Sequence, residues 1–386
     1  MWDTFRALHP LLTLIYPKAV SPMIQSMLNM YKEGGWIPKW PNPSYTNIMI
    51  GTPGDAIIAD AFARGFRNYN LKEAWNAIYK DAMTPPEGDA HKRWADRAPW
   101  TSYEAREGLT YYKKLGYVPA DKTNESVSST LEFALEDYCV AQVAKGIGKE
   151  KEYRFFMKRS KNYRNLFDPK TGFMTPRLSD GSFYSGNPKK YAAFTEGSKW
   201  TYLFCVMQDV PGLIKLMGRN SFISKLDENF SGGHYAYDNE PENHYHYPYL
   251  YDWVDQPWNA DTILTNVVEK NYRDTPDGIT GNDDCGQMSA WYIFTTLGFY
   301  PVCPASGEYA VGRSFFPKVT LHLTAPGKNT FTIIAQNFST KNIYVKSIEL
   351  DGKPLHSLFL KYSDLYNHKV LEFDVTDKLG EAMDYR

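Results

Sequence analysis

The sequence has little that would commit the protein to a membrane or to a nucleic acid. Its 386 residues carry 43 Lys and Arg against 44 Asp and Glu, a net charge of −1. This balance favours neither nucleic acid nor an anionic membrane as a partner. No stretch approaches the roughly twenty uninterrupted apolar residues that a membrane-spanning helix needs. The chain starts at Met1 without a basic and then an apolar segment, so it shows no signal peptide.

Cysteine is also scarce, and its four residues lack the spacing of a metal site. Cys139 and Cys205 fall in apolar helical patterns and are expected to be small core residues. Whether Cys285 and Cys303 form a disulfide is left open by the sequence. Sequons for N-glycosylation, which favour a secreted protein, occur at Asn124, Asn229 and Asn337.

Aromatic residues, by contrast, make up 16 % of the chain, with 29 Tyr and 10 Trp. Sugar rings pack their C–H faces on aromatic side chains, so this composition suits a carbohydrate-binding protein. An equally ordinary interpretation is that the rings fill a large core.

The first four-fifths of the chain is predicted to be helical. Capping residues, apolar periodicity and glycine stops predict helices over 21–34, 55–64, 70–82, 101–116, 129–143, 149–163, 199–207, 211–217, 260–272 and 287–297. Long loops rich in Pro, Gly, Trp and Asp separate them, and such loops are usually functional. Helical hairpins joined in this way predict an (α/α) toroid or barrel, with an irregular helical solenoid as the alternative.

Beyond about Gly312 the pattern changes to the period of two that is typical of strands. Strands are expected at 318–324, 330–335, 343–350 and 370–375, and Asp351-Gly352 is a hairpin signal. We therefore expect a mainly α fold with a small C-terminal β-sheet module. The predicted domains are a helical catalytic domain over 1–312 and a β module over 313–386.

Three short segments combine carboxylates with aromatics or amides: 194–202, 238–243 and 281–291. Glycoside hydrolysis needs two carboxyl groups, one acid and one base, beside a sugar held by aromatic and polar groups. Glu196 is followed by Trp200 and Tyr202, and aromatic walls would bury its carboxyl and raise its pKa, as a general acid requires. The alternative is a glutamate that only stabilises a helix N-terminus.

Asp283 and Asp284 stand side by side before a predicted helix, and adjacent carboxylates repel each other unless a ligand or donor compensates. Glu240 and Asn243 offer oxygen ligands of the kind that calcium prefers. His244 and His246 alternate within an aromatic run and are expected to pack or to donate hydrogen bonds rather than to bind zinc.

These segments, together with Trp2-Asp-Thr-Phe-Arg-Ala-Leu8, 165–173 and 299–303, resemble glycoside hydrolase family 92, the calcium-dependent exo-acting α-mannosidases. The resemblance implies that Glu196 is the catalytic acid and Asp284 the base, with Asp283 or Asn282 assisting. It implies calcium near Glu240 and Asn243. It also implies that the sugar is contacted by Trp2, Asp3, Asn239, Glu240, Trp200 and Trp258.

The resemblance implies an inverting exo-α-mannosidase, most simply one that acts on α-1,2-linked mannosides of glycans, and a secreted protein. Inversion would separate the carboxyls of Glu196 and Asp284 by about 6.5–9.5 Å. Family members carry an N-terminal β-sandwich before the segment at Trp2, so we expect a longer protein or a separate β-sandwich chain as partner. The alternative function is a fragment that binds mannosides without catalysis.

Overall fold

The computed structural model describes residues 1–42, 45–46, 48–91, 104–187, 190–231, 244–323 and 330–383. These residues form two compact units. Unit 1 comprises Met1–Phe5 and Ser21–Gly218, and unit 2 comprises Arg6–Val20 and Arg219–Arg386. The change from helices to strands near residue 312 is present, but the strands cluster with the preceding helices rather than apart from them.

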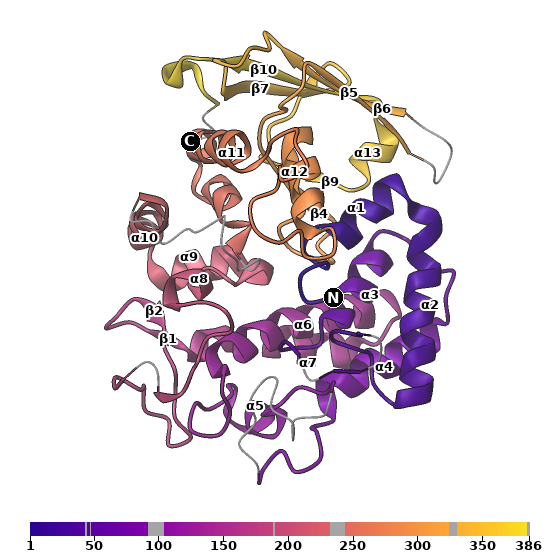
Figure 1. Ribbon diagram of the computed structural model, residues 1–386, viewed down its shortest axis with the longest axis vertical. Coiled ribbons are helices and arrows are strands. Elements are labelled where there is room, and N and C mark those ends of the chain that lie inside the picture. Colours follow the sequence, from indigo (N-terminus) through magenta and orange to yellow (C-terminus); the bar gives the residue numbers. More distant parts are fainter. Residues whose placement is uncertain are drawn as a thin grey trace. The chain divides into compact units, whose positions relative to one another are not determined.

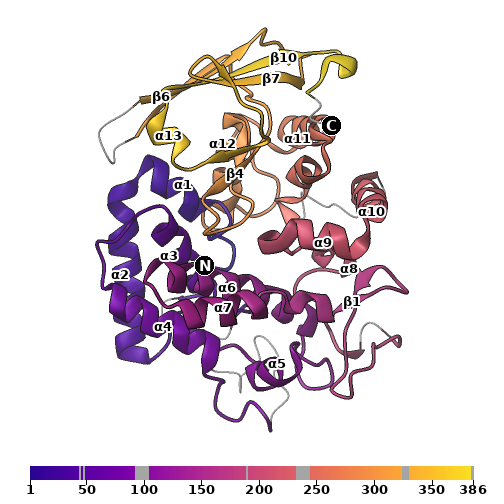
Figure 2. The ribbon, with the colours of Figure 1, turned by 180° about the vertical axis from the view of Figure 1, so that it is seen from behind.

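Unit 1 is helical and is organised around one long buried helix. Its helices are α2 (Pro17–Gly34, whose first four residues belong to unit 2), α3 (Pro53–Ala63), α4 (Leu71–Met83), α5 (Leu109–Leu115), α6 (Ser126–Gly146), α7 (Glu150–Arg159), α8 (Lys199–Tyr202) and α9 (Val210–Met217). Helix α6 contacts α3, α4 and α7 (Figures 1 and 2). It is buried on nearly every side rather than along one face, as expected of a helix surrounded by others.

Two buried carboxylates of α6, those of Glu136 and Asp137, are paired with arginines. Arg106 is fully buried and lies 2.9 Å from Asp55 of α3, and 3.2 and 2.8 Å from Glu136 and Asp137 of α6. Arg159 of α7 makes two further contacts with Asp137. Burial raises the pKa of Asp55 to about 6 despite the nearby arginine. These ion pairs join α3, α6 and α7 and the segment before α5.

Unit 2 combines five larger helical elements with two sheets in its described residues. They are α1 (Leu8–Ile15), α10 (Arg219–Ser231), the 3-10 helix η5 (Tyr247–Val254), α11 (Pro257–Asn271) and α12 (Gln287–Leu297). A three-stranded sheet has the order β3 (Phe299–Tyr300), β4 (Glu308–Val311), β9 (Phe359–Lys361). A five-stranded sheet has the order β5 (Lys318–His322), β6 (Thr330–Gln336), β10 (Val370–Thr376), β7 (Tyr344–Leu350), β8 (Lys353–Pro354).

The five-stranded sheet lies against α11 (Figure 1). The backbone N–H of Val345 in β7 donates to Oδ2 of Asp261 in α11, at 3.0 Å. Strands β6 and β10 are parallel, and the other pairs are antiparallel. The predicted hairpin at Asp351-Gly352 is confirmed, since β7 pairs with β8 and both turn residues have positive φ, 50° and 71°.

Several predicted helix boundaries are wrong. Ser21-Pro22 does not begin a helix but lies inside α2, whose buried Val20, Ile24 and Leu28 outweigh the cost of an internal proline. The capping box predicted at 129–132 lies inside α6, which begins at Ser126. The helix predicted from 101 begins at Leu109, residues 101–103 being outside the described ones. The helix predicted over 199–207 ends at Tyr202.

Two helices of unit 2 were not predicted, α1 and α10. In contrast, the N-cap of α4 is confirmed, because Oδ1 of Asn70 accepts a hydrogen bond from the Glu73 N–H at 3.1 Å. The stops at Gly34 and Gly116 and the bounds of α12 also agree with the sequence.

Candidate active site

Glu196 lies in a loop, 192–198, that the protein holds in an unusual backbone conformation. Its φ is 42°, and that of Ala192 is 44°. Left-handed residues other than glycine cost free energy and persist where the surrounding structure forces them, often at functional sites. Glycine is required at the next position, since a Cβ on Gly197 would lie 2.4 Å from Oγ1 of Thr201.

The loop is fixed on both sides by hydrogen bonds within unit 1. Oγ of Ser128, in α6, accepts from the N–H of Thr195 at 2.9 Å, and the Tyr202 hydroxyl donates to the Thr195 carbonyl at 2.8 Å. Ser198 then caps α8, and its own N–H donates to Oγ1 of Thr201. The residue before Glu196 is therefore held from two directions, which positions its backbone.

The Glu196 side chain itself is exposed. The expectation that aromatic walls bury this carboxyl is thus wrong. The aromatic residues of the segment turn inward instead. Trp200 is 9 % exposed and packs edge-on against Phe173 at 4.7 Å, and Tyr202 is fully buried. Trp200 therefore supports the loop and offers little surface to a sugar.

The predicted carboxyl pair, Asp283 and Asp284, lies in unit 2, in a turn that precedes α12. Asp284, Cys285 and Gly286 have φ values of 49°, 59° and 100°, three consecutive left-handed residues. The two aspartates differ in what they contact. Oδ1 of Asp283 accepts from the N–H and the hydroxyl of Ser289, at 2.9 and 2.8 Å, and so satisfies a backbone donor in the first turn of α12, whose N-cap is Gly286.

Asp284 is not used in this way. Its side chain is half-buried, and its Oδ2 is buried without a hydrogen-bond partner among the residues that the structure describes. A buried carboxylate oxygen without a donor is costly, and in native proteins such an atom calls for an explanation, such as a catalytic role. Asn282, the other candidate assistant, is exposed.

The turn is anchored within unit 2. Oε1 of the buried Gln287 accepts from the N–H of Ala7 at 2.9 Å, ahead of α1. The indole N–H of Trp291 donates to the Tyr245 carbonyl at 2.9 Å. Helix α12 thus links the start of the chain to the segment that begins at residue 244. Sequence reasoning did not find these anchors, because neither Gln287 nor Ser289 stands out by type.

The residues predicted to contact sugar near the N-terminus are buried. Trp2 is fully buried and packs with Met49 and Ile50, so its ring has no surface on which a sugar could stack. Asp3 is 2 % exposed. Trp258, at the start of α11, is half-buried. Asn239, Glu240 and Asn243 lie outside the described residues.

Comparison with known proteins assigns the family. Residues 1–377 match the catalytic domain of glycosyl hydrolase family 92. The chain belongs to this family. An α-mannosidase of family 92 from Bacteroides thetaiotaomicron is 34 % identical in sequence, with a TM-score of 0.87. The similarity covers 98 % of this chain and 49 % of that one.

Two other relatives are similar to this family 92 chain and support the same assignment. An inverting family 92 mannosidase of Bacteroides thetaiotaomicron is 33 % identical with a TM-score of 0.88, over 98 % of this chain and 53 % of that one. A protein named an uncharacterized secreted glycosidase, from Arthroderma benhamiae, is 30 % identical over 90 % of this chain and 48 % of its own. The chain therefore spans about half the length of these relatives. The predicted fold class, an (α/α) barrel of helical hairpins followed by a small β module, is confirmed.

The resemblance to family 92 implies a calcium site near Glu240 and Asn243. The nearest described residues in the chain are His244 and those that follow it. His244 and His246 are 1 % and 2 % exposed, and their rings pack against Tyr245 and Tyr247. The expectation that they are packing residues is confirmed. The expected oxygen ligands, Glu240 and Asn243, lie outside the described residues, so calcium binding there stays a prediction. The described residues hold no group of three or more His, Cys, Asp or Glu arranged for a metal.

Other predictions can also be compared with the structure. Cys285 is exposed with a free thiol and Cys303 is buried, so they do not form a disulfide with each other. Asn229 is 1 % exposed, whereas Asn337 is exposed, so of these two sequons Asn337 can carry a glycan on the folded protein. No helix within the described ranges combines the length and apolar character needed to cross a membrane.

Proposed function

We propose that this chain is the catalytic part of a calcium-dependent, inverting exo-α-mannosidase that acts on α-1,2-linked mannosides of glycans. The family assignment supports a glycosidase, and the similarity to solved α-mannosidases supports mannose as the sugar released. The name of the Arthroderma benhamiae relative supports an exported protein.

The observation that carries the proposal is the contrast between the two aspartates before α12. Asp283 is occupied by the N–H and hydroxyl of Ser289, whereas Oδ2 of Asp284 is buried and has no donor among the described residues. A buried carboxylate oxygen without a donor is costly, and the role that we assign to it is to accept a proton from the attacking water once substrate is bound. Asp284 is therefore the base in our mechanism, and Asp283 is the residue that holds the turn.

Glu196 is the acid in this mechanism. It donates its proton to the glycosidic oxygen as the C–O bond breaks, while water attacks C1 from the opposite face and gives its proton to Asp284. Because the Glu196 side chain is exposed, we assign the exclusion of water from its carboxyl to the substrate, whose leaving group would cover it. Rigid anchoring of Thr195 keeps Glu196 in place for this step.

Calcium completes the proposal. Glu240 and Asn243 would hold it, and when bound it would polarise sugar hydroxyls and favour ring distortion. Of the predicted sugar contacts within the described residues, the half-buried Trp258 is the one that we propose to contact the sugar.

The experiment is to follow mannose release from α-linked mannobioses by NMR. We expect β-mannose as the first product, with the α-1,2 linkage cleaved fastest. If α-mannose appeared first, the reaction would proceed with retention and Asp284 would be a nucleophile instead. Because the chain spans about half the length of its relatives, the assay includes the isolated chain, and mannoside binding without release would favour a non-catalytic fragment.

A further inference from the structure

The loop that carries Glu196 also caps the long buried helix α6. The first N–H groups of a helix have no acceptor within it and need one from outside. At the start of α6 the N-cap residue, Glu125, has a φ of 55°, and its side chain does not cap the helix. The loop supplies the acceptors instead. The Glu125 N–H donates to the Ala192 carbonyl at 2.7 Å. The Val127 N–H donates to the Ala193 carbonyl at 3.1 Å.

Ser128 extends this contact to the residue next to Glu196. Its hydroxyl oxygen accepts from the Thr195 N–H at 2.9 Å, across 67 positions of the chain. Both residues are buried, with Ser128 at 0 % and Thr195 at 1 % exposure. A buried N–H that loses its acceptor is costly because no water replaces the lost bond. Without the Ser128 hydroxyl, we therefore expect the backbone at Thr195 to shift towards another acceptor.

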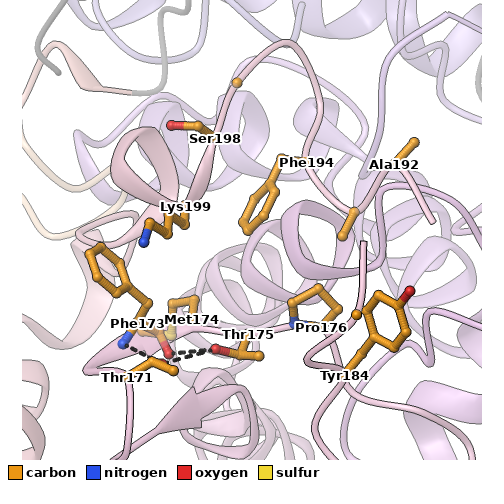
Figure 3. A pocket seen from close by; sticks show the side chains of 13 residues that line it. Thr171, Phe173, Met174, Thr175, Pro176, Tyr184, Ala192, Phe194, Ser198 and Lys199 are labelled. Atoms are coloured by element: carbon orange, nitrogen blue, oxygen red, sulfur yellow. Dashed lines mark hydrogen bonds between the residues drawn. The ribbon is translucent and has the colours of Figure 1, made fainter. Parts of the chain in front are cut away.

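The loop has room for such a shift, because it borders a pocket as well as α6. Phe194 and Ser198 line this pocket of about 460 Å³, whereas Thr195 does not (Figure 3). Glu196 also has a left-handed φ of 42°. Such a conformation costs free energy for a residue other than glycine and persists only where the surrounding structure imposes it. Once the bond to Thr195 is lost, the loop should relax and the Glu196 carboxyl should move with it.

We propose that Ser128 is a positioning residue for the proton transfer by Glu196. It acts through the backbone of Thr195 and does not itself carry the transferred proton. The inference rests on the proposed role of Glu196 as the acid. A general acid must lie within about 2.6–3.2 Å of the oxygen that it protonates, so a displacement of about 1 Å is enough to slow this step.

The experiment compares two mannosides whose leaving groups differ in their need for a proton. The departing oxygen of α-1,2-mannobiose must be protonated, whereas 2,4-dinitrophenolate departs without a proton. We expect Ser128→Ala to lower kcat for mannobiose about tenfold, a part of the roughly 10²–10⁴-fold that a general acid contributes. For 2,4-dinitrophenyl α-mannoside kcat should fall less than about twofold, because this step needs no acid. Both rates are measured on one sample, so their ratio does not depend on how much of the variant is folded.

Ser129→Ala is the matched control. Ser129 is the next residue of α6 and is also 0 % exposed, but its hydroxyl has no hydrogen-bond partner among the residues that the structure describes. Its removal makes the same change of volume in the same helix and should leave the ratio of the two kcat values unaltered. Ser128→Thr keeps a hydroxyl acceptor and should restore most of the ratio.

The inference and the proposed function can fail separately. If Glu196→Gln lowers the ratio but Ser128→Ala does not, or if Ser129→Ala lowers it equally, Ser128 does not position the acid and the proposed function stands. If Glu196→Gln lowers both kcat values equally, or if the unmodified protein cleaves neither substrate, the proposed function fails and the role of Ser128 fails with it.

Discussion

Replacing Asp284 by asparagine should separate catalysis from stability. Asparagine adopts left-handed φ values about as readily as aspartate, so the turn at φ 49° is preserved. The base is lost, and removal of a general base typically costs 10²–10⁴ in rate, or about 3 to 5 kcal/mol of barrier. Since Oδ2 is a buried carboxylate oxygen with no donor among the described residues, the neutral amide should not lower the free energy of unfolding and should raise it by up to about 1 kcal/mol.

Asp283 gives the opposite expectation. Its Oδ1 accepts two hydrogen bonds from Ser289, and each such bond contributes about 1 kcal/mol. Asp283→Ala should therefore lower the free energy of unfolding by about 2 kcal/mol. Asp283→Asn keeps an acceptor oxygen and should lose less than about 1 kcal/mol. Both variants should retain more of kcat than Asp284→Asn.

The assay is initial-rate release of mannose from α-1,2-mannobiose, together with denaturant unfolding of the same samples. The reasoning fails if Asp284→Asn keeps more than about a tenth of kcat, given the usual size of a base's contribution. If Asp283→Asn is the more damaged enzyme at unchanged stability, Asp283 is the base. In that case the free Oδ2 of Asp284 has another cause.

Three further outcomes are expected. Glu196→Gln should reduce turnover of mannobiose at least about tenfold more than turnover of an aryl mannoside with a good leaving group, which needs no proton; equal losses would exclude Glu196 as the acid. Chelation should abolish mannose release and calcium should restore it, through ligands that include Glu240; full activity of metal-depleted protein would exclude calcium. Burial raises the pKa of Asp261 to about 7, so the folded state holds its proton more tightly than the unfolded state. The stability that this pKa shift contributes is fully present below about pH 4 and is lost as pH rises towards 7. The loss amounts to about 4 kcal/mol at most. Asp261→Asn, whose side-chain oxygen still accepts from the N–H of Val345, should retain that stability at pH 8 when unfolding by denaturant is measured. A matching gain at pH 8 in the half-buried Asp364→Asn control would contradict this account.

Local patterns in the sequence predicted the elements whose signals are local. The bounds of α12, the N-cap at Asn70 and the turn at Asp351-Gly352 depend on residues a few positions apart. Where burial decided the outcome, the sequence misled. Pro22 lies inside α2 because the apolar face of that helix packs into the core, and the serines at 126–129 begin α6 rather than cap it later.

The sequence by itself determined the family, the candidate carboxyls and the succession of helices and then strands, because these are written in residue type and spacing. Only the tertiary structure decided how each carboxyl is used. Asp283 and Asp284 are identical in type, yet one accepts from Ser289 in the first turn of α12 and the other keeps a buried oxygen without a donor among the described residues. Glu196 was expected to be buried by its aromatic neighbours, but Trp200 and Tyr202 pack inward and leave it exposed. Burial and hydrogen bonding depend on partners far away in the chain, such as Ser128 for the Glu196 loop, and no local pattern encodes which partner arrives.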